Sequence, residues 1–411
     1  MGMNAIEKIL ANHSEVDVVR PGDVVMVDVD VTVQFDHARP DILEIANPDK
    51  VVLVHDHVVP APTVQAANNA KRMREFVERF GIEHYFPVGK HGISHVLVAA
   101  EGYALPGQIL VNADSHTCSS GAMNCLARGM GGPEMLYIMC KGQTWYLVGP
   151  TTRVVLEGSL PEQVYPRDVI HHLPGTYGDF AGRNLEWYGD GLSTIGIDGR
   201  LTMATISAEL SAEFSLFPYD DVLAEYLDGR AKWPYEPAFP DDDAEYEQVI
   251  TVDLSSLEPQ VVLPDRVAWN TKGAREVAED RIKIDQAFIG SCANGRLSDF
   301  AVAAEILEGR TIARGTRMIV TPGSQEILKE AIRLGYVETL MDAGAVVTSS
   351  TCGACFGGHM GLLADGEVCI TASTRNFKGR MGSPEARVYM GSPATVAASA
   401  VTGYITDPRD L

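Results

Sequence analysis

The chain has 411 residues, of which 55 are Asp or Glu and 33 are Lys or Arg, so its formal net charge is −22. This length predicts two or three domains with ample core, and the negative charge argues against binding to nucleic acid or to anionic membrane surfaces. The 7 cysteines are odd in number and thinly spread, which excludes a disulfide framework. Neither a secretory signal pattern nor a long apolar span is present in the sequence, so we expect a cytoplasmic protein.

In the first part of the chain, polar residues follow predicted strands directly. Asp56-His57 follows one strand, and Asp114-Ser115-His116 follows another. Strands that alternate with polar turns and helices are typical of parallel α/β layers, whose ligands bind at the carboxyl ends of the strands. The predicted elements here are strands at 24–33, 51–54 and 106–111 and a helix at 65–80.

Two further segments follow. A predicted strand begins near Thr152, and the acidic, Pro-rich stretch 233–246 is predicted to be a solvated loop. A third α/β segment begins near Lys272, with a strand at 317–320 and a helix whose N-cap is Ser324. The sequence therefore predicts three α/β domains, at residues 1–148, 149–271 and 272–411.

Three cysteines lie in two glycine-rich turns of the last segment. Cys352 and Cys355 form a Cys-x-x-Cys, and Cys292 follows a strand-like stretch at 282–289. A Cys-x-x-Cys can hold zinc, form a redox disulfide or bind an iron–sulfur cluster, and its spacing does not decide between them. Three cysteines are one fewer than a closed tetrahedral site requires, which suits a metal centre with an open position.

In this order and at these separations, the motifs resemble those of the aconitase superfamily. The resemblance covers essentially the whole chain and is greatest to the large subunits of two-chain members, such as the 3-isopropylmalate dehydratases and homoaconitases. It implies three α/β/α layered domains around a central iron–sulfur site. Single-chain aconitases continue into a swivelling fourth domain that this sequence lacks, so the resemblance also implies a separate small subunit. The stretches that carry it are 56–60, 113–118, 290–296, 321–324, 352–355 and 375–380.

The resemblance implies that Cys292, Cys352 and Cys355 bind a [4Fe–4S] cluster whose fourth iron keeps an open site. Such an iron acts as a Lewis acid on a substrate hydroxyl. Arg375 and Arg380 match arginines that bind the substrate carboxylates, because a guanidinium grips a carboxylate through two parallel hydrogen bonds. The proton-abstracting serine of the family lies on the swivelling domain, so we expect this chain alone to be catalytically incomplete.

Carboxylate–histidine pairs complete the site that the resemblance implies. A carboxylate beside a histidine holds its tautomer and raises its basicity. The site glutamate of the family lies four residues after an Asn, so Glu213 is the better match and Glu209 the alternative. Glu209 and Thr374 stand where relatives usually have Asn, which marks a divergent member. The catalytic set is Asp56, His57, His95, Asp114, His116 and Glu213 or Glu209, with Ser115 as a substrate-binding residue.

The predicted function is the large subunit of an iron–sulfur hydro-lyase that dehydrates a small hydroxy di- or tricarboxylic acid, with rehydration as a further step. A 3-isopropylmalate-like substrate, as in leucine biosynthesis, is the first expectation. Substrates of the homocitrate or homoaconitate, citramalate, dimethylmalate and maleate types are alternatives. Two other classes stay open: a cluster-bearing regulatory or RNA-binding protein, against which the acidic charge weighs, and a zinc or redox protein, which bound sulfide would exclude.

Overall fold

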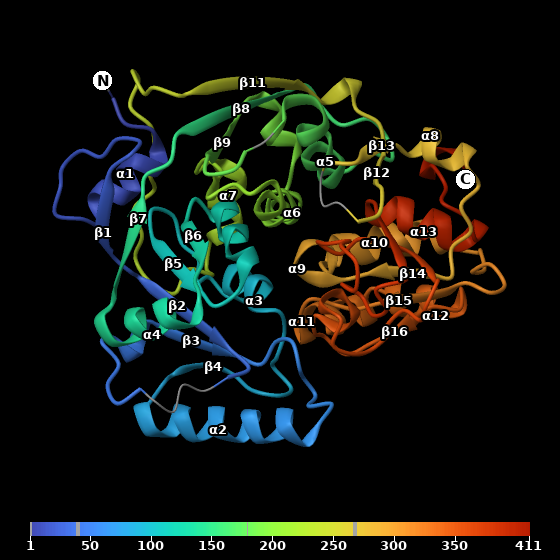
Figure 1. The fold of residues 1–411 in the computed structure, drawn as a ribbon, viewed down its shortest axis with the longest axis horizontal. Coiled ribbons are helices and arrows are strands. Elements are labelled where there is room, and N and C mark those ends of the chain that lie inside the picture. The colour runs from blue at the N-terminus through green and yellow to red at the C-terminus, as the bar shows by residue number, and fades with distance from the viewer. Residues whose placement is uncertain (1, 38–41, 179, 266–268) are drawn as a thin grey trace.

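The computed structural model describes residues 2–37, 42–178, 180–265 and 269–411. In the described residues the strands form one two-stranded sheet and three larger sheets. In Figure 1 the five-stranded sheet lies at the lower left, the four-stranded sheet across the top and the seven-stranded sheet on the right. Each of the three larger sheets takes its strands from one continuous stretch of chain.

The five-stranded sheet is parallel throughout, in the order β4-β3-β2-β5-β6. The chain builds outward from β2 to β4 and then crosses back to β5, so the strand order reverses beside β2. Ligands bind at such reversal points in open α/β sheets. The strands are β2 (Val31–Phe35), β3 (Val51–Val54), β4 (His84–Phe86), β5 (Ile109–Asn112) and β6 (Leu126–Gly129), and the helices are α2 (Val64–Phe80), α3 (Ser94–Ala100), the 3₁₀-helix η2 (Ser115–Met123) and α4 (Gly132–Lys141).

The predicted strand at 24–33 is wrong, because the structure contains two strands there. β1 (Val24–Asp28) pairs antiparallel with β7 (Gln143–Leu147), whereas β2 belongs to the five-stranded sheet. Between β1 and β2, the Asp30 side chain accepts a hydrogen bond from the backbone N–H of Ile109 at 2.7 Å. The valines of the sequence continue from β1 into β2 with little interruption, so the apolar pattern did not reveal that the chain passes from one sheet to another.

The four-stranded sheet is also parallel, in the order β10-β9-β8-β11. Helix α6 is buried along most of its length and lies near the centre of Figure 1. The acidic stretch 233–246 contains neither helix nor strand, which confirms the predicted loop. The elements are β8 (Thr151–Glu157), α5 (Pro166–Tyr177), β9 (Asn184–Tyr188), α6 (Ile197–Ser207), the 3₁₀-helix η4 (Ala208–Leu210), β10 (Phe214–Leu216), α7 (Asp221–Leu227) and β11 (Gln248–Asp253).

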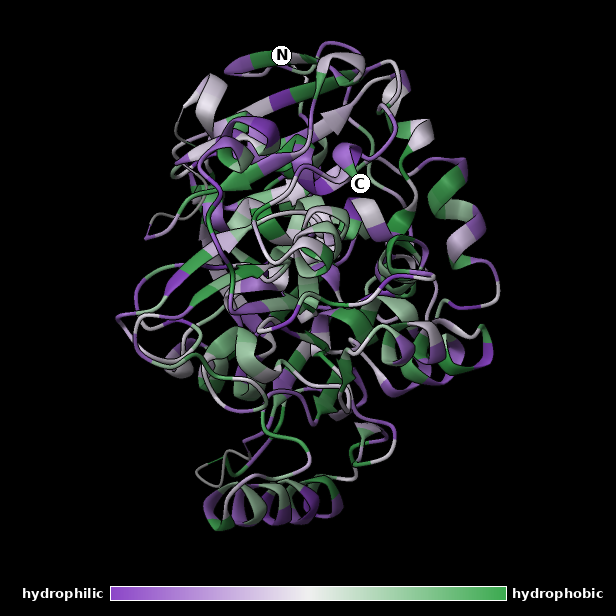
Figure 2. Ribbon diagram, turned by 90° about the vertical axis from the view of Figure 1, so that its right-hand side faces the viewer, coloured by the Kyte–Doolittle hydropathy of each residue, from purple (hydrophilic) through white to green (hydrophobic). Residues whose placement is uncertain are grey.

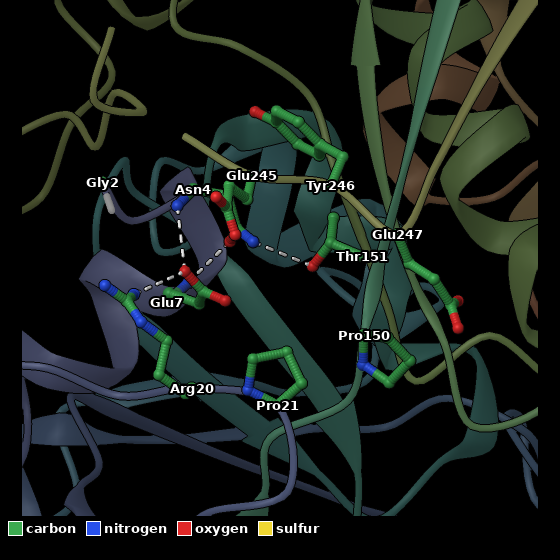
Figure 3. Close-up of a pocket in the computed structure, with 10 residues that line it drawn as sticks. All are labelled: Gly2, Asn4, Glu7, Arg20, Pro21, Pro150, Thr151, Glu245, Tyr246 and Glu247. Atoms are coloured by element: carbon green, nitrogen blue, oxygen red, sulfur yellow. Dashed lines mark hydrogen bonds and ion pairs between the residues drawn. The ribbon is translucent and has the colours of Figure 1, made fainter. Parts of the chain in front are cut away.

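Residues at the start of helix α1 (Ala5–Asn12) form hydrogen bonds that connect the beginning of the chain to this second sheet. The side chain of Asn4 accepts a hydrogen bond from the Glu7 N–H at 2.9 Å, and the Glu7 carboxylate accepts one from the Asn4 N–H at 3.1 Å. This capping box satisfies two backbone donors at the helix start. The Asn4 amide also donates to Thr151 Oγ1 at 3.2 Å, at the first residue of β8 (Figure 3).

The seven-stranded sheet has the order β13-β12-β18-β17-β14-β15-β16 and is parallel from β18 to β16. Ser324 caps α11 as predicted, since its Oγ accepts a hydrogen bond from the Ile327 N–H at 3.2 Å. Because β12 and β13 join this sheet, we propose that the third domain begins before residue 260. The strands are β12 (Gln260–Val262), β13 (Thr271–Gly273), β14 (Gln286–Ile289), β15 (Arg317–Val320), β16 (Val346–Val347), β17 (Val368–Thr371) and β18 (Arg387–Met390). The helices are α8 (Ala274–Glu279), α9 (Ser291–Asn294), α10 (Leu297–Leu307), α11 (Gln325–Arg333), α12 (Tyr336–Asp342) and α13 (Pro393–Thr402).

One large apolar core joins the first two sheets. It runs from Val33 in the first sheet to Leu156 in the second, and it reaches Ala293, the neighbour of Cys292. Burial of this much apolar surface holds the second sheet against the turn that carries Cys292. Figure 2 shows α2 at the lower edge with hydrophilic residues along much of its length, in keeping with its few buried side chains. Among the described residues, no helix is both long enough and apolar enough to cross a membrane.

Candidate functional site

Turns that follow strands of the first and third sheets meet at one place. Thr351 Oγ1, in the turn after β16, donates hydrogen bonds to the backbone oxygens of Asp56 at 3.0 Å and His57 at 2.8 Å, in the turn after β3. The Ile93 N–H, just before α3, donates to Gly323 O after β15 at 2.7 Å. In Figure 1, α3 and α9 face each other near the centre of the view. The polar strand ends of the two sheets therefore share one site.

A cavity of about 200 Å³ lies at this meeting point. All three predicted cysteine ligands and both predicted substrate arginines line it. A larger cavity, of about 300 Å³, lies beside α1 and is lined by residues that include no cysteine or histidine (Figure 3). The predicted residues thus select the smaller cavity as the candidate site. Its lining residues are His57, Ile93, His95, Asp114, Ser115, His116, Ser291, Cys292, Cys352, Cys355, Phe356, Arg375 and Arg380.

The backbone that presents the cysteines is unusual at two points. Ser291, immediately before Cys292, has φ of 79°, a left-handed backbone conformation that residues other than glycine rarely adopt. Gly353 has φ of 56° directly after Cys352, where glycine carries no steric penalty. Strained backbone of this kind is concentrated at functional sites, where the surrounding structure holds it in place. Both turns therefore present buried thiols to the cavity.

The donor set fits a cluster better than a single metal ion. Among the described residues, the group of three whose potential ligand atoms lie within 4.8 Å of one another consists of Asp56, His57 and Cys352. The three cysteines do not converge that closely, whereas zinc holds each thiolate at about 2.3 Å. Soft thiolates spread around a cavity are the donors of an iron–sulfur cluster. The thiols of Cys292, Cys352 and Cys355 therefore fit such a group.

Charge distinguishes two of these cysteines. Burial raises the pKa of the Cys352 thiol well above its usual value, with the Asp56 charge adding to the effect, and Cys352 Sγ lies 3.3 Å from Asp56 Oδ1. Burial also acts to raise the pKa of Cys355, but the charge of Arg380, whose Nη2 lies 3.9 Å from Sγ, helps to bring it below its usual value. Arg380 thus favours the thiolate that binds metal.

His57 lies among three carboxylates. Its Nδ1 is 3.2 Å from Asp56 Oδ1 and 3.8 Å from Asp36 Oδ2, and its Nε2 is 3.6 Å from Asp114 Oδ2. Burial lowers the pKa of His57, but the three carboxylates outweigh burial and raise the pKa to about 10. His57 is therefore protonated at neutral pH and offers no lone pair to a metal ion.

Asp36 is a site residue that the sequence analysis missed. Its Oδ1 accepts a hydrogen bond from the Asp56 N–H at 2.9 Å, and its Oδ2 accepts one from the His57 N–H at 2.6 Å. It therefore holds the turn that carries both residues. Asp36 directly follows β2, so its place at a strand end was the signal available. The predicted strand ended too early, at residue 33, for that signal to be used.

Asp114 joins two histidines. Its Oδ1 lies 2.9 Å from His95 Nε2 and 3.4 Å from His116 Nδ1, and it also accepts a hydrogen bond from the His116 N–H at 2.8 Å. Burial alone would raise the pKa of Asp114, but the charges of His95 and His116 and their hydrogen bonds hold it well below its usual value. Asp114 is therefore an ionised carboxylate that orients both rings toward the cavity.

The structure brings Glu209, and not Glu213, into this network. Glu209 Oε1 accepts a hydrogen bond from Arg375 Nε at 2.6 Å and lies 2.7 Å from His116 Nε2. Glu213 pairs instead with Arg128 at 2.6 Å and lines a neighbouring cavity of about 310 Å³. The sequence spacing had favoured Glu213. The contacts favour Glu209, because it alone of the two touches a histidine and an arginine of the candidate site.

The stabilisation that charged His57 contributes should fall as pH rises above 6.5, because the pKa of His57 is raised in the folded chain. The pKa is about 10 in the folded state and 6.5 for an ordinary histidine, so the stabilisation is complete below pH 6.5 and lost by about pH 10. We expect the difference in melting temperature between wild type and His57→Gln to shrink between about pH 7 and about pH 9.5. Parallel melting curves for the two proteins across this window would contradict the assigned charge.

Gly92→Ala should destabilise the junction between the first and third sheets. A Cβ at Gly92 would lie 2.8 Å from Gly323 O and 2.8 Å from Ser324 Cα, so the backbones would have to move apart. We expect a loss of about 1–3 kcal/mol of folding free energy, measured by chemical denaturation. The control is Gly175→Ala, because a Cβ there meets nothing within 4 Å and alanine favours a helix. Equal stability of Gly92→Ala and wild type would show that the junction can relax.

Comparison with known proteins identifies the family to which the chain is similar. A sequence model of the aconitase family (aconitate hydratase) matches residues 7–403. A protein of Mycolicibacterium smegmatis named 3-isopropylmalate dehydratase large subunit is 52% identical over 415 residues, covering 100% of this chain and 98% of its own length. A protein of Nitratiruptor with the same name is 41% identical, with 100% of both chains covered. The crystal structure of aconitase X from Thermococcus kodakaraensis has a TM-score of 0.50 at 14% identity, covers 93% of this chain and 92% of its own, and shares the fold.

Proposed function

The chain belongs to the aconitase family, and from this premise we propose that it is the large subunit of a two-subunit hydro-lyase that acts on 3-isopropylmalate. The observation that carries the proposal is 52% identity, along the whole chain, to a protein named for that activity. The word "subunit" in the names of the relatives supports a separate small subunit as partner. A cytoplasmic location and the absence of nucleic-acid binding stay predictions from the sequence.

Family membership implies an iron–sulfur cluster, and we propose the [4Fe–4S] type, held by Cys292, Cys352 and Cys355. When bound, its open iron supplies a Lewis acid for the hydroxyl of the substrate. Three buried thiols around one cavity support this assignment. Arg380 beside Cys355 favours the ionised thiol that such a group requires.

The two arginines bind the substrate carboxylates in this proposal. Arg375 is held before substrate arrives, since its Nε donates to Glu209 at 2.6 Å and its Nη2 donates to Ser115 Oγ at 2.9 Å. A planar guanidinium fixed in this way presents its remaining N–H groups to a carboxylate without a further loss of side-chain entropy. Arg380 approaches the same cavity from the turn after β17. Two anchors orient a dicarboxylic acid and leave its hydroxyl in the cavity.

The histidines hold the protons that a departing hydroxyl needs. Burial acts to lower the pKa of His116, but its interaction with Cys292 and its hydrogen bonds to Asp114 and Glu209 hold it well above its usual value. His57 is protonated for a similar reason. An imidazolium that faces the cavity can donate a proton to the leaving oxygen. The base that removes the carbon-bound proton is not assigned to this chain, and we propose that the small subunit supplies it.

The test is substrate discrimination by the complex. The chain is co-expressed with its small subunit and purified without oxygen, and formation of the unsaturated acid is followed. We expect kcat/KM for 3-isopropylmalate to exceed that for homocitrate and for citramalate by about 100-fold or more. Homocitrate brings a third carboxylate into a pocket shaped for a branched apolar side chain, and citramalate, with only a methyl group, leaves that pocket partly unfilled. A higher kcat/KM for homocitrate or citramalate would overturn the substrate but keep the reaction class.

A further inference from the structure

Arg167 is a buried charge that none of the motifs includes. It lies in α5 and is 1% exposed. Its Nη1 donates to Asn294 Oδ1 at 2.7 Å and to Ala372 O, and its Nη2 donates to Ser373 O. Burial lowers its pKa to about 10, so it remains charged at neutral pH. Burying an arginine costs desolvation energy, and apolar residues can often replace buried ion pairs without loss of stability. Stability alone therefore does not explain why an arginine is buried at this position.

The partners of Arg167 belong to the two turns that build the candidate site. Asn294 ends α9, two residues after Cys292, and Ser373 lies two residues before Arg375. These turns leave the ends of β14 and β17, which are neighbouring parallel strands. One guanidinium from helix α5, which connects β8 to β9 of the second sheet, therefore bridges the cysteine turn and the arginine turn of the third sheet.

Further hydrogen bonds connect the Arg167 bridge to the backbone of Cys292. The Asn294 amide donates to Asp299 Oδ1 at 2.9 Å, and Asp299 Oδ2 accepts a hydrogen bond from the Arg296 N–H at 2.8 Å. Arg296 Nη2 then donates to the backbone oxygen of Cys292 at 2.9 Å. The Cys292 turn is thus enclosed by side-chain hydrogen bonds, and Arg167 is the member that comes from outside the third sheet.

We propose that Arg167 is a positioning residue that sets the separation between Cys292 and Arg375, and thereby between the cluster and the substrate carboxylate. The guanidinium donates from two nitrogens held in one plane and so spans an amide oxygen and two carbonyl oxygens, whereas a lysine ammonium donates from a single nitrogen and does not keep that spacing. The residue touches neither substrate nor cluster in this proposal. The inference rests on the proposed substrate for its kinetic assay and on the proposed cluster, but not on the substrate, for its spectroscopic one.

Arg200 provides a matched control. It is a second fully buried arginine, in α6, and it donates to Leu192 O at 2.9 Å and Ile195 O at 3.1 Å. Its remaining bonds are to the two carboxylate oxygens of Asp220, at 2.8 and 2.6 Å. All of these partners lie within the second sheet region. Arg200→Lys therefore removes comparable hydrogen bonds without touching either turn of the site.

The experiment compares Arg167→Lys with Arg200→Lys in the assembled two-subunit enzyme. We expect Arg167→Lys to raise KM by about tenfold or more, with a smaller effect on kcat, because Arg375 is displaced relative to the cluster. The EPR spectrum of its cluster after mild oxidation should also differ from that of wild type. Arg200→Lys should lower the melting temperature and leave KM within about twofold of wild type. Equal KM values for the two variants would overturn the proposal.

Two further measurements cover the remaining outcomes. If Arg167→Lys does not fold, Asn294→Ala removes one partner of the bridge and should raise KM in the same direction; an unchanged KM would overturn the proposal. If both variants fold, their KM effects should combine to less than the product of the single effects, because both act on one bond. If the wild-type complex turns over none of the acids, the proposed function fails. The role of Arg167 is then tested by the EPR spectra of the iron-loaded chain. Identical spectra for Arg167→Lys and Arg200→Lys would overturn that role.

Discussion

Cys355→Ser should reduce kcat by about a thousandfold or more and should lower the iron bound per chain. A serine hydroxyl does not ionise near neutral pH and is a harder donor than a thiolate, so it is a poor ligand for an iron–sulfur cluster. The position is sensitive because Arg380 lies 3.9 Å from Cys355 Sγ and favours the thiolate. The measurements are iron and sulfide content, the EPR spectrum and turnover of the assembled enzyme.

Cys125→Ser is the matched control for this prediction. Cys125 is also fully buried, but it lies outside the candidate site and its thiol donates to Gln108 O at 3.4 Å, a bond that a hydroxyl can replace. We expect Cys125→Ser to keep the iron content and turnover of wild type. Wild-type iron and activity in Cys355→Ser would remove Cys355 from the ligand set and return zinc or a structural role to consideration.

Glu209→Gln should reduce kcat by about a hundredfold, whereas Glu213→Gln should stay within about threefold of wild type. The two substitutions are equally conservative, so they differ only in what each carboxylate touches. Glu209 holds His116 at 2.7 Å and Arg375 at 2.6 Å, and Glu213 holds Arg128 outside the cavity. Loss of the Glu209 charge removes one cause of the raised pKa of His116.

The pH profile separates this role from a general loss of stability. If His116 donates a proton, activity requires its charged form and declines as pH rises through its pKa. Glu209→Gln lowers that pKa, so the alkaline limb of kcat should move to lower pH, and Glu213→Gln should leave it in place. A larger effect of Glu213→Gln on kcat would mean that the 208–213 turn rearranges when the small subunit binds.

Several parts of this protein were determined by the sequence itself. The fold class followed from polar turns at predicted strand ends, because parallel α/β sheets collect such turns at one edge. The family followed from the resemblance of the motifs in those turns. That resemblance grouped the three cysteines with Arg375 and Arg380, and in the structure all five line one cavity. The functional roles of these residues stay proposals until the variants above are measured.

Contacts between distant segments were decided only by the tertiary structure. The hydrogen bond from Arg167 to Ser373 joins residues 206 positions apart, and the pairing of Asp36 with the Asp56 turn depends on which strands are neighbours. Ser211 lies between Glu209 and Glu213 and has φ of 60°, a left-handed conformation that changes the direction of the chain. The two glutamates therefore contact different residues. Apolar patterns and motif spacing report the local backbone state, and they do not report how two sheets dock. The sequence therefore named most groups of the site, and the packing of the sheets selected which of them meet.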